Sequence, residues 1–219
     1  MGLVHENTGD RAAAERSYLD ALVLDPTALE PMSRLYVLYQ FTSDRDKIAR
    51  LERLLVASLE KKQDSAIHHD WLGQVYLRTG RLEKAEASIS AAIALQPQEP
   101  EFRISLGALK ARTGKLDEAR AAYEDALRIR PGSGLALYNL GVLKAMQQDY
   151  DGAIDYFQQA ERAGQDSVAL MNSMAQALEA KGRYDGAIAY LKRSLQKRPD
   201  QPDRREALRR LETRLKKGR

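Results

Sequence analysis

The chain has 219 residues, of which 35 are Lys or Arg, 31 are Asp or Glu and none is Cys. With 43% hydrophobic residues it can build a packed core, whereas the lack of cysteine excludes disulfide frameworks, thiolate zinc sites and cysteine nucleophiles. No stretch approaches the roughly 18 apolar residues of a membrane span, and residues 1–10 do not resemble a signal peptide. The isoelectric point near 9.2 points to an acidic partner unless the charge is confined to one segment.

The chain repeats with a step of 34 residues, and its predicted elements are the helices of those repeats. The first segment, residues 1–28, holds Ala14, Tyr18 and Pro26 at positions that mark the second half of a repeat. Because only a shortened first half precedes them, we expect the sequence to be a fragment that opens within a first helix.

The second segment, residues 29–65, fits the repeat poorly. Its step to the next segment is 37 residues, from Leu35 to Leu72, and Ser43 stands where the other repeats carry a glycine. Apolar residues spaced along Ile48–Leu59 still form one helical stripe. The pattern predicts a degenerate repeat whose second helix is about one turn longer than usual.

Four regular units follow, at 66–99, 100–133, 134–167 and 168–201. Each carries a bulky and then a small residue in its first half: Leu72-Gly73, Leu106-Gly107, Leu140-Gly141 and Met174-Ala175. The turn position of the four units holds Gly80, Gly114, Gln148 and Gly182. One position in the second half is always alanine: Ala85, Ala119, Ala153 and Ala187.

Each unit has the pattern of two amphipathic helices joined by a tight turn, because apolar residues recur at spacings of three and four on both sides of the turn position. Glycine at the turn supplies the left-handed backbone that ends the first helix. Small residues at the Gly73 and Ala85 positions let the two helices approach closely. Prolines end the second helix of three units, at Pro97, Pro131 and Pro199.

These residues resemble the tetratricopeptide repeat (TPR), whose helix-turn-helix unit has 34 residues. The motif matches it position by position: Leu72-Gly73-x-x-Tyr76, Gly80, Ala85, Ile89, Ala92 and Pro97. The resemblance implies an all-α fold, a right-handed α-solenoid of TPR helix-turn-helix units with a C-terminal capping helix. We expect residues 1–219 to form a single such solenoid.

The last predicted element, residues 202–219, is a basic capping helix. Residues 203–219 hold eight Arg or Lys and three Asp or Glu, a net charge of +5, which leaves −1 for the rest of the chain. Asp203 and Glu206 predict a capping box at the start of the helix. Two acid–base pairs four residues apart predict ion pairs within it: Glu206 with Arg210, and Glu212 with Lys216. The basicity indicates a solvated cap; the alternative, a nucleic-acid or anionic-membrane patch, is disfavoured because no base-stacking aromatics accompany the arginines.

No group of side chains in the sequence predicts catalysis. The histidines are His5, His68 and His69, and neighbours in a helix diverge by about 100°, so the last two cannot bind one metal from a single helix face. The glycines follow the repeat and form no phosphate-binding loop, and no nucleophile–base pair stands out. We expect no catalytic residue, no metal, no cofactor, and a protein that is not an enzyme.

The resemblance implies that partners bind in a concave groove lined by the first helices of the repeats. In the TPR family the groove side chains come from positions 2, 5, 6, 9, 12 and 13 of each unit, which we call the groove positions. The residues we expect to bind a peptide or protein are Asp70, Gln74, Arg78, Ile104, Ala108, Arg112, Tyr138, Asn139, Val142, Asn172 and Gln176. Amides there can hydrogen-bond an extended peptide, and apolar side chains offer pockets. No lysine occupies a groove position, so the Lys–Asn clamp of TPR co-chaperones is not expected.

The sequence therefore predicts a TPR scaffold for a protein or peptide partner, with no nucleic-acid partner and no membrane insertion. The Ala- and Arg-rich, cysteine-free composition favours a bacterial protein, and analogy favours a cell-envelope assembly machine. One alternative is the substrate-recruiting region of a larger enzyme such as a glycosyltransferase. Another is a homo-oligomer that self-associates through the incomplete N-terminal repeat. We expect a soluble protein, cytoplasmic or periplasmic.

Overall fold

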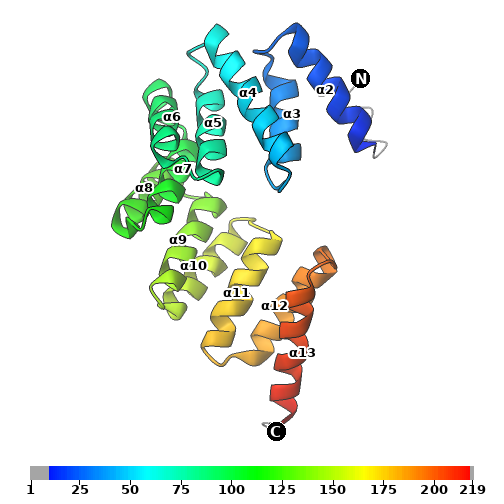
Figure 1. Ribbon diagram of the computed structural model, residues 1–219. Helices are drawn as coiled ribbons and strands as arrows, with labels where there is room; N and C mark the ends of the chain where they lie inside the picture. Colours follow the sequence, from blue (N-terminus) through cyan, green and yellow to red (C-terminus); the bar gives the residue numbers. More distant parts are fainter. Residues whose placement is uncertain (1–9, 218–219) are drawn as a thin grey trace. The chain divides into compact units, whose positions relative to one another are not determined.

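The computed structural model describes residues 10–217, and every regular element in that range is an α-helix (Figure 1). The helices of this range are α2 (Arg11–Leu24), α3 (Leu29–Tyr39), α4 (Arg45–Lys61), α5 (Ala66–Arg78), α6 (Leu82–Leu95), α7 (Pro100–Arg112), α8 (Leu116–Ile129), α9 (Gly134–Met146), α10 (Tyr150–Arg162), α11 (Val168–Ala180), α12 (Tyr184–Lys197) and α13 (Pro202–Lys217). Several pairs of helices that are neighbours in sequence pack against each other, among them α5 with α6, α9 with α10 and α11 with α12. Within these residues no helix has both the length and the apolar character that a bilayer crossing needs.

The chain divides into two compact units, residues 1–109 and residues 110–219. In the first unit, α2 to α6 and most of α7 contribute to the core. Leu35, Leu55 and Ile89 are completely buried there, each from a different helix of the α3–α6 region. The core of this unit therefore includes the degenerate repeat as well as the first regular one.

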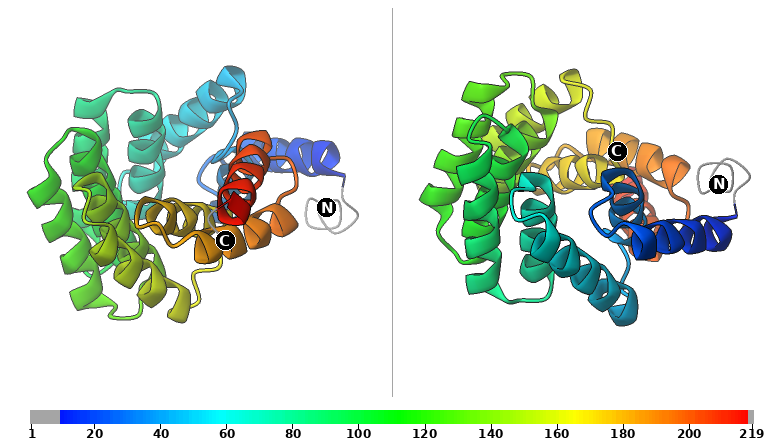
Figure 2. Two further views of the ribbon diagram at one scale, coloured as in Figure 1. Left: turned by 90° about the horizontal axis from the view of Figure 1, so that it is seen from below. Right: turned by 90° about the horizontal axis from the view of Figure 1, so that it is seen from above.

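In the second unit, α8 to α13 pack in the same way around a core of their own. Phe157, Met174 and Leu211 are at most 1% exposed and come from α10, α11 and α13. Figure 2 shows α13 lying beside α12, and the two helices are in contact. The basic C-terminal helix is thus packed onto the last hairpin through its leucines.

The irregular segment has the longer second helix that its 37-residue step predicts. α4 has 17 residues, whereas α6 and α8 each have 14. Leu51, Leu55 and Leu59 are buried at intervals of four along α4, which confirms the apolar stripe. The extra residues are thus accommodated as one additional helical turn.

Small residues in the first helix allow the second helix to approach closely. A Cβ atom added at Gly73 would lie 2.6 Å from Ile89 Cγ1, and one added at Gly141 would lie 2.6 Å from the Phe157 ring. Such distances are far inside van der Waals contact. The predicted close approach is therefore confirmed for α5 with α6 and for α9 with α10.

The turn position has the predicted left-handed backbone in all four regular units. Gly80, Gly114 and Gly182 have φ values of 78°, 77° and 71°, and Gln148 has a φ of 62°. Gln148 is the only non-glycine residue with a positive φ among the described residues. A Cβ in this conformation crowds the backbone and costs about 1–2 kcal/mol, so Gln148 is strained where its three counterparts are not.

The variant Gln148→Gly is expected to raise the free energy of unfolding by about 1 kcal/mol, because relief of the strain exceeds the entropy lost by the added glycine. Gly80→Ala is the matched reverse change: no atom lies within 4 Å of the new methyl group, so only the backbone strain acts. It should destabilise by about 1 kcal/mol. Urea unfolding followed by far-ultraviolet circular dichroism measures both, and an unchanged stability of Gln148→Gly would contradict the strain.

The start of α13 differs from the predicted capping box. The helix begins at Pro202, so Asp203 lies inside the first turn and is not the N-cap. Proline is favoured at the first helical position because its missing N–H would have no partner there. Gln201, the residue before it, donates from its side-chain nitrogen to the carbonyl oxygens of Ser194 and Arg198, at 3.2 and 2.8 Å. The loop before α13 is thus fixed by Gln201.

The ion pairs predicted within α13 are also wrong. Arg210 pairs with Glu179 of α11 at 2.6 Å, and Glu212 pairs with Lys192 of α12 at 2.9 Å. The packed helices bring these partners from the preceding hairpin, which the spacing along a single helix could not reveal. The basic helix is therefore attached by both leucines and cross-helix ion pairs.

Candidate functional site

The expected site residues lie on the first helix of each regular hairpin. In the first unit, the expected site residues are Asp70, Gln74 and Arg78 on α5, and Ile104 and Ala108 on α7. In the second unit they are Arg112 at the end of α7, Tyr138, Asn139 and Val142 on α9, and Asn172 and Gln176 on α11. Some of these side chains are buried or hydrogen-bonded within the fold, and others are accessible to a partner.

Asp70 is the most deeply buried polar residue of the expected set, with 3% of its surface exposed. Its Oδ2 accepts a hydrogen bond from Gln74 Nε2 at 2.6 Å, and Gln74 Oε1 accepts one from the Tyr36 hydroxyl at 2.5 Å. Burial raises the pKa of Asp70 to about 6; hydrogen bonds from Ser105 and Gln74 oppose this rise, and the charge of Glu101 adds to it. The carboxylate is thus ionised at neutral pH inside a network that joins α3 to α5.

Arg78 and Trp71 also join α5 to α3. Arg78 donates from Nη1 to the Tyr39 carbonyl at 3.0 Å and from Nη2 to the Thr42 carbonyl at 2.7 Å. The Trp71 ring stacks on Tyr36, with centroids 4.9 Å apart and planes 14° from parallel. Gln74 and Arg78 therefore link α5 to α3, and some of their hydrogen-bond donors and acceptors are occupied by contacts within the fold.

His68 is buried on the other side of α5. Its Nδ1 lies within hydrogen-bond distance of Ser58 Oγ, at 2.8 Å, and its ring centroid lies 5.5 Å from that of Trp71. The pKa of His68 is lowered to about 4, mainly by burial and to a smaller extent by the charges of Lys62 and His69. His68 is therefore a neutral, packed side chain at physiological pH. Within residues 10–217, His, Asp and Glu side chains do not gather in threes as a metal site would require.

In the second unit, Asn172 has a structural contact on each of its side-chain polar atoms. Its Nδ2 donates to Gln201 Oε1 at 2.9 Å, and its Oδ1 accepts from the buried Ser194 hydroxyl at 2.7 Å. Tyr138, on α9, places its hydroxyl 3.3 Å from Ser173 Oγ. The Asn172 amide thus stabilises the loop before α13 through its hydrogen bonds to Gln201 and Ser194.

The other expected residues are more open. Arg112 and Gln176 are exposed, and Ala108, Asn139 and Val142 are half-buried. Ile104 is buried and contributes its side chain to packing. The residues of the expected set that can reach a partner without breaking a contact within the fold are Ala108, Arg112, Asn139 and Gln176, whereas Val142 is partly packed against the core of the second unit.

Five apolar groove positions were missed or left out of the expected set. In the first unit these are Val37 and Phe41, which are 56% and 86% exposed, and Ile67. In the second unit they are Leu135 and Met146. Val37 and Phe41 belong to the degenerate repeat, onto which the groove positions were not carried. Counting from Leu35 as the bulky position of that repeat would have identified both.

Comparisons with known proteins agree with this geometry. A family model for the tetratricopeptide repeat matches residues 48–100, 104–168 and 147–202, more than half of the chain. No curated protein matches the sequence. Three crystal structures are similar. The APC/C hetero-tetramer Cut9–Hcn1 matches with a TM-score of 0.77 and 17% sequence identity, over 96% of this chain and 41% of that chain. The type IV pilus biogenesis factor PilW matches with a TM-score of 0.71 and 20% identity over 94% of each chain, and a thermophilic TPR protein of Thermus thermophilus with a TM-score of 0.70 and 20% identity over 86% of this chain and 97% of that chain. The chain thus spans about two fifths of the Cut9–Hcn1 chain, and these likenesses show the fold.

Proposed function

We propose that this chain, which belongs to the tetratricopeptide repeat family, is a scaffold that holds a protein or peptide partner through its groove positions. The observation that carries the proposal is the distribution of exposed apolar side chains. Nine large ones are exposed among residues 10–217, and five of them occupy groove positions: Val37, Phe41, Ile67, Leu135 and Met146. Groove positions are six of the 34 in a unit, so about one or two would be expected by chance.

The chemistry of these positions fits an extended or helical peptide. Exposed apolar side chains supply contact area, and open amides such as Asn139 and Gln176 can pair with peptide N–H and C=O groups. Uncompensated apolar surface on a soluble protein marks an interaction site more often than it marks chance exposure. The partner is therefore expected to present apolar side chains next to free backbone groups.

A second candidate function is self-association, and a specific observation favours it. Val23 and Leu24, at the end of α2, are 80% and 87% exposed and lie outside the groove positions. A second copy of the chain could cover them. The finer expectations of a bacterial source, a cell-envelope machine and an attached enzyme stay predictions, because the similar structures support the fold alone.

The two candidates predict opposite results for two matched double variants of the full chain. Val37→Ala with Phe41→Ala removes exposed apolar surface at groove positions, and Val23→Ala with Leu24→Ala removes a similar surface elsewhere in the same unit. Each protein is used for affinity purification from the source organism, and the proteins that co-purify are quantified by mass spectrometry. Under the first proposal, partners co-purify with the wild type and with the Val23/Leu24 variant but not with the Val37/Phe41 variant. Sedimentation velocity measures self-association in the same samples.

Both pairs are exposed, so both variants are expected to unfold within about 0.5 kcal/mol of the wild type. Loss of partners with the Val23/Leu24 variant, together with a shift from oligomer to monomer, would favour self-association. Equal retention by both variants would contradict the groove positions as the binding surface.

A further inference from the structure

A surface cavity of about 520 Å³ lies in the first unit, beside the turn between α3 and α4 and the turn after α5. Three arginines line it, together with one glutamate, Ser43, Thr79 and two apolar residues, Ile48 and Ala49. Only one lining residue, Arg78, occupies a groove position. The cavity is therefore a separate feature from the proposed partner surface.

The cavity's glutamate is already neutralised by one arginine. Arg81 donates from Nη1 to Glu52 Oε1 and from Nη2 to Oε2, each at 2.5 Å. Its Nε donates to Thr79 Oγ1 at 3.0 Å, and its guanidinium lies 4.6 Å from the Tyr76 ring centroid. Arg81 and Glu52 thus form a fixed, charge-balanced wall.

The other two arginines have no carboxylate partner among the described residues. Arg78 is held by the carbonyl oxygens of Tyr39 and Thr42, which fix the position of its guanidinium without cancelling its charge. Arg45 is exposed at the start of α4, and no acceptor in residues 10–217 is paired with it. Asp44, its neighbour, lies outside the lining and accepts from the N–H groups of Asp46 and Lys47 as the N-cap of α4. The lining therefore carries two uncompensated positive charges.

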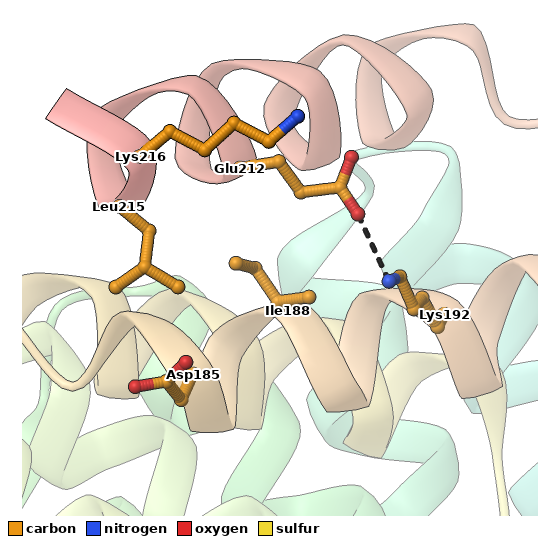
Figure 3. Close-up of a pocket in the computed structure, with 6 residues that line it drawn as sticks. All are labelled: Asp185, Ile188, Lys192, Glu212, Leu215 and Lys216. Atoms are coloured by element: carbon orange, nitrogen blue, oxygen red, sulfur yellow. Dashed lines mark ion pairs between the residues drawn. The ribbon is translucent and has the colours of Figure 1, made fainter. Parts of the chain in front are cut away.

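Two cavities of the second unit have their charges balanced. The cavity between α12 and α13 is lined by two lysines and two carboxylates, and Lys192 pairs with Glu212 at 2.9 Å (Figure 3). In the cavity beside Met171, both basic residues of the lining are ion-paired: Lys197 with Asp166, and Arg193 at 2.7 Å with Glu161, which lies outside the lining. What distinguishes the cavity at Arg45 is that two of its lining arginines, Arg45 and Arg78, have no carboxylate partner among residues 10–217.

We propose that this cavity binds a phosphate monoester. A phosphomonoester carries a charge of about −1.5 to −2 at neutral pH, which matches the two free guanidinium charges, and its oxygens suit the planar fork of arginine. The Ser43 hydroxyl adds a donor, and Ile48 and Ala49 offer contact for the stem that carries the phosphate. The source of the phosphate is a modified side chain of a partner or a small phosphorylated molecule.

Titration of the full chain with inorganic phosphate at constant ionic strength tests the site, with backbone amide shifts in nuclear magnetic resonance as the readout. We expect saturable shifts at Ser43, Arg45 and Thr79 with a dissociation constant in the millimolar range. Arg45→Ala should weaken binding about tenfold, because it removes one of the two uncompensated charges. Its side chain is exposed and unpaired among the described residues, so the variant is expected to fold normally.

Arg53→Ala is the matched control, since Arg53 is an arginine on the same helix that does not line the cavity. It should bind phosphate as the wild type does. Absence of saturable shifts, an equal loss in Arg53→Ala, or acetate binding as tight as phosphate would each overturn the proposal. A phosphoserine peptide that binds tighter than free phosphate, and only when Arg45 is present, identifies a modified partner; equal affinities identify a small phosphorylated molecule.

Discussion

Replacing Gly141 by alanine is expected to lower the free energy of unfolding by about 1–2 kcal/mol. The new methyl group would lie 2.6 Å from two carbons of the Phe157 ring and 3.2 Å from the carbonyl oxygen of Ala153, so α9 and α10 must move apart. The better helix propensity of alanine, worth up to about 1 kcal/mol, offsets only part of this cost. Urea unfolding monitored by circular dichroism gives the value.

A second substitution identifies the cause of this loss. The next repeat carries Ala175 at the Gly141 position and Leu191 at the Phe157 position, which is a compatible pair. Gly141→Ala combined with Phe157→Leu should therefore be more stable than the sum of the single effects predicts, by at least about 1 kcal/mol. Gly132→Ala, with no atom within 4 Å of its added Cβ, is the control and should be nearly neutral. Strict additivity in the double variant would contradict the steric account.

The free energy of unfolding should contain two large pH-dependent contributions of opposite sign, both from the first unit. His68 has its pKa lowered to about 4, below the value of about 6.5 in an unfolded chain, so its contribution to stability is present above pH 6.5 and is lost as the pH falls to 4. Asp70 has its pKa raised to about 6 from about 3.9, so its contribution is present below pH 4 and is lost as the pH rises through 6. Each amounts to about 3 kcal/mol, and the two nearly cancel between pH 4 and 6.

Single substitutions separate the two contributions. Between pH 4 and pH 6.5, the stability of the wild type relative to His68→Gln should rise by about 3 kcal/mol. Relative to Asp70→Asn, it should fall by a similar amount between pH 4 and pH 6. Trp71, the only tryptophan, packs against His68 in this unit, so its fluorescence during urea unfolding reports the relevant region. Parallel pH profiles for the wild type and both variants would contradict the shifted pKa values.

The all-α TPR solenoid could be predicted from the sequence because the repeat is determined by local interactions. Within one hairpin, the turn requires a glycine with positive φ, and the contact between the two helices requires a small residue. Gly80 and Gly141 therefore indicate, in the sequence itself, where a turn and a helix contact lie. Even the greater length of α4 could be predicted, because the step from Leu35 to Leu72 is three residues longer than the usual repeat. Where the requirement lies within about 34 residues, the sequence pattern is sufficient.

The candidate site was harder to predict, because the role of a groove position depends on contacts across helices. Nothing in the spacing of Asn172 indicates that Gln201 and Ser194 occupy its amide. The same applies to Arg78, whose donors meet carbonyls of the preceding hairpin, and to Arg210, which pairs with Glu179 and not with Glu206. Long polar side chains have many partners within reach, and packing decides among them.

Val37 and Phe41 were missed for a different reason. The degenerate repeat departs from the family pattern at Tyr36, at its turn and in its second helix, yet Leu35 keeps the bulky position of its first helix. Counted from Leu35, Val37 lies on α3 and Phe41 lies in the turn that follows it. The count from Leu35 gives their positions, and the structure adds that both side chains are exposed. The same turn carries Ser43 and leads into Arg45, the first residue of α4, and both residues line the proposed phosphate cavity.

The central claim, that the groove positions hold a protein partner, is tested most directly by the affinity of a purified partner for matched variants. Once affinity purification has supplied that partner, isothermal titration calorimetry compares the wild type, Val37→Ala with Phe41→Ala, and Val23→Ala with Leu24→Ala. We predict at least a tenfold loss of affinity for the first double variant, which corresponds to about 1.4 kcal/mol, and no loss for the second. Equal affinities for all three proteins would contradict the account.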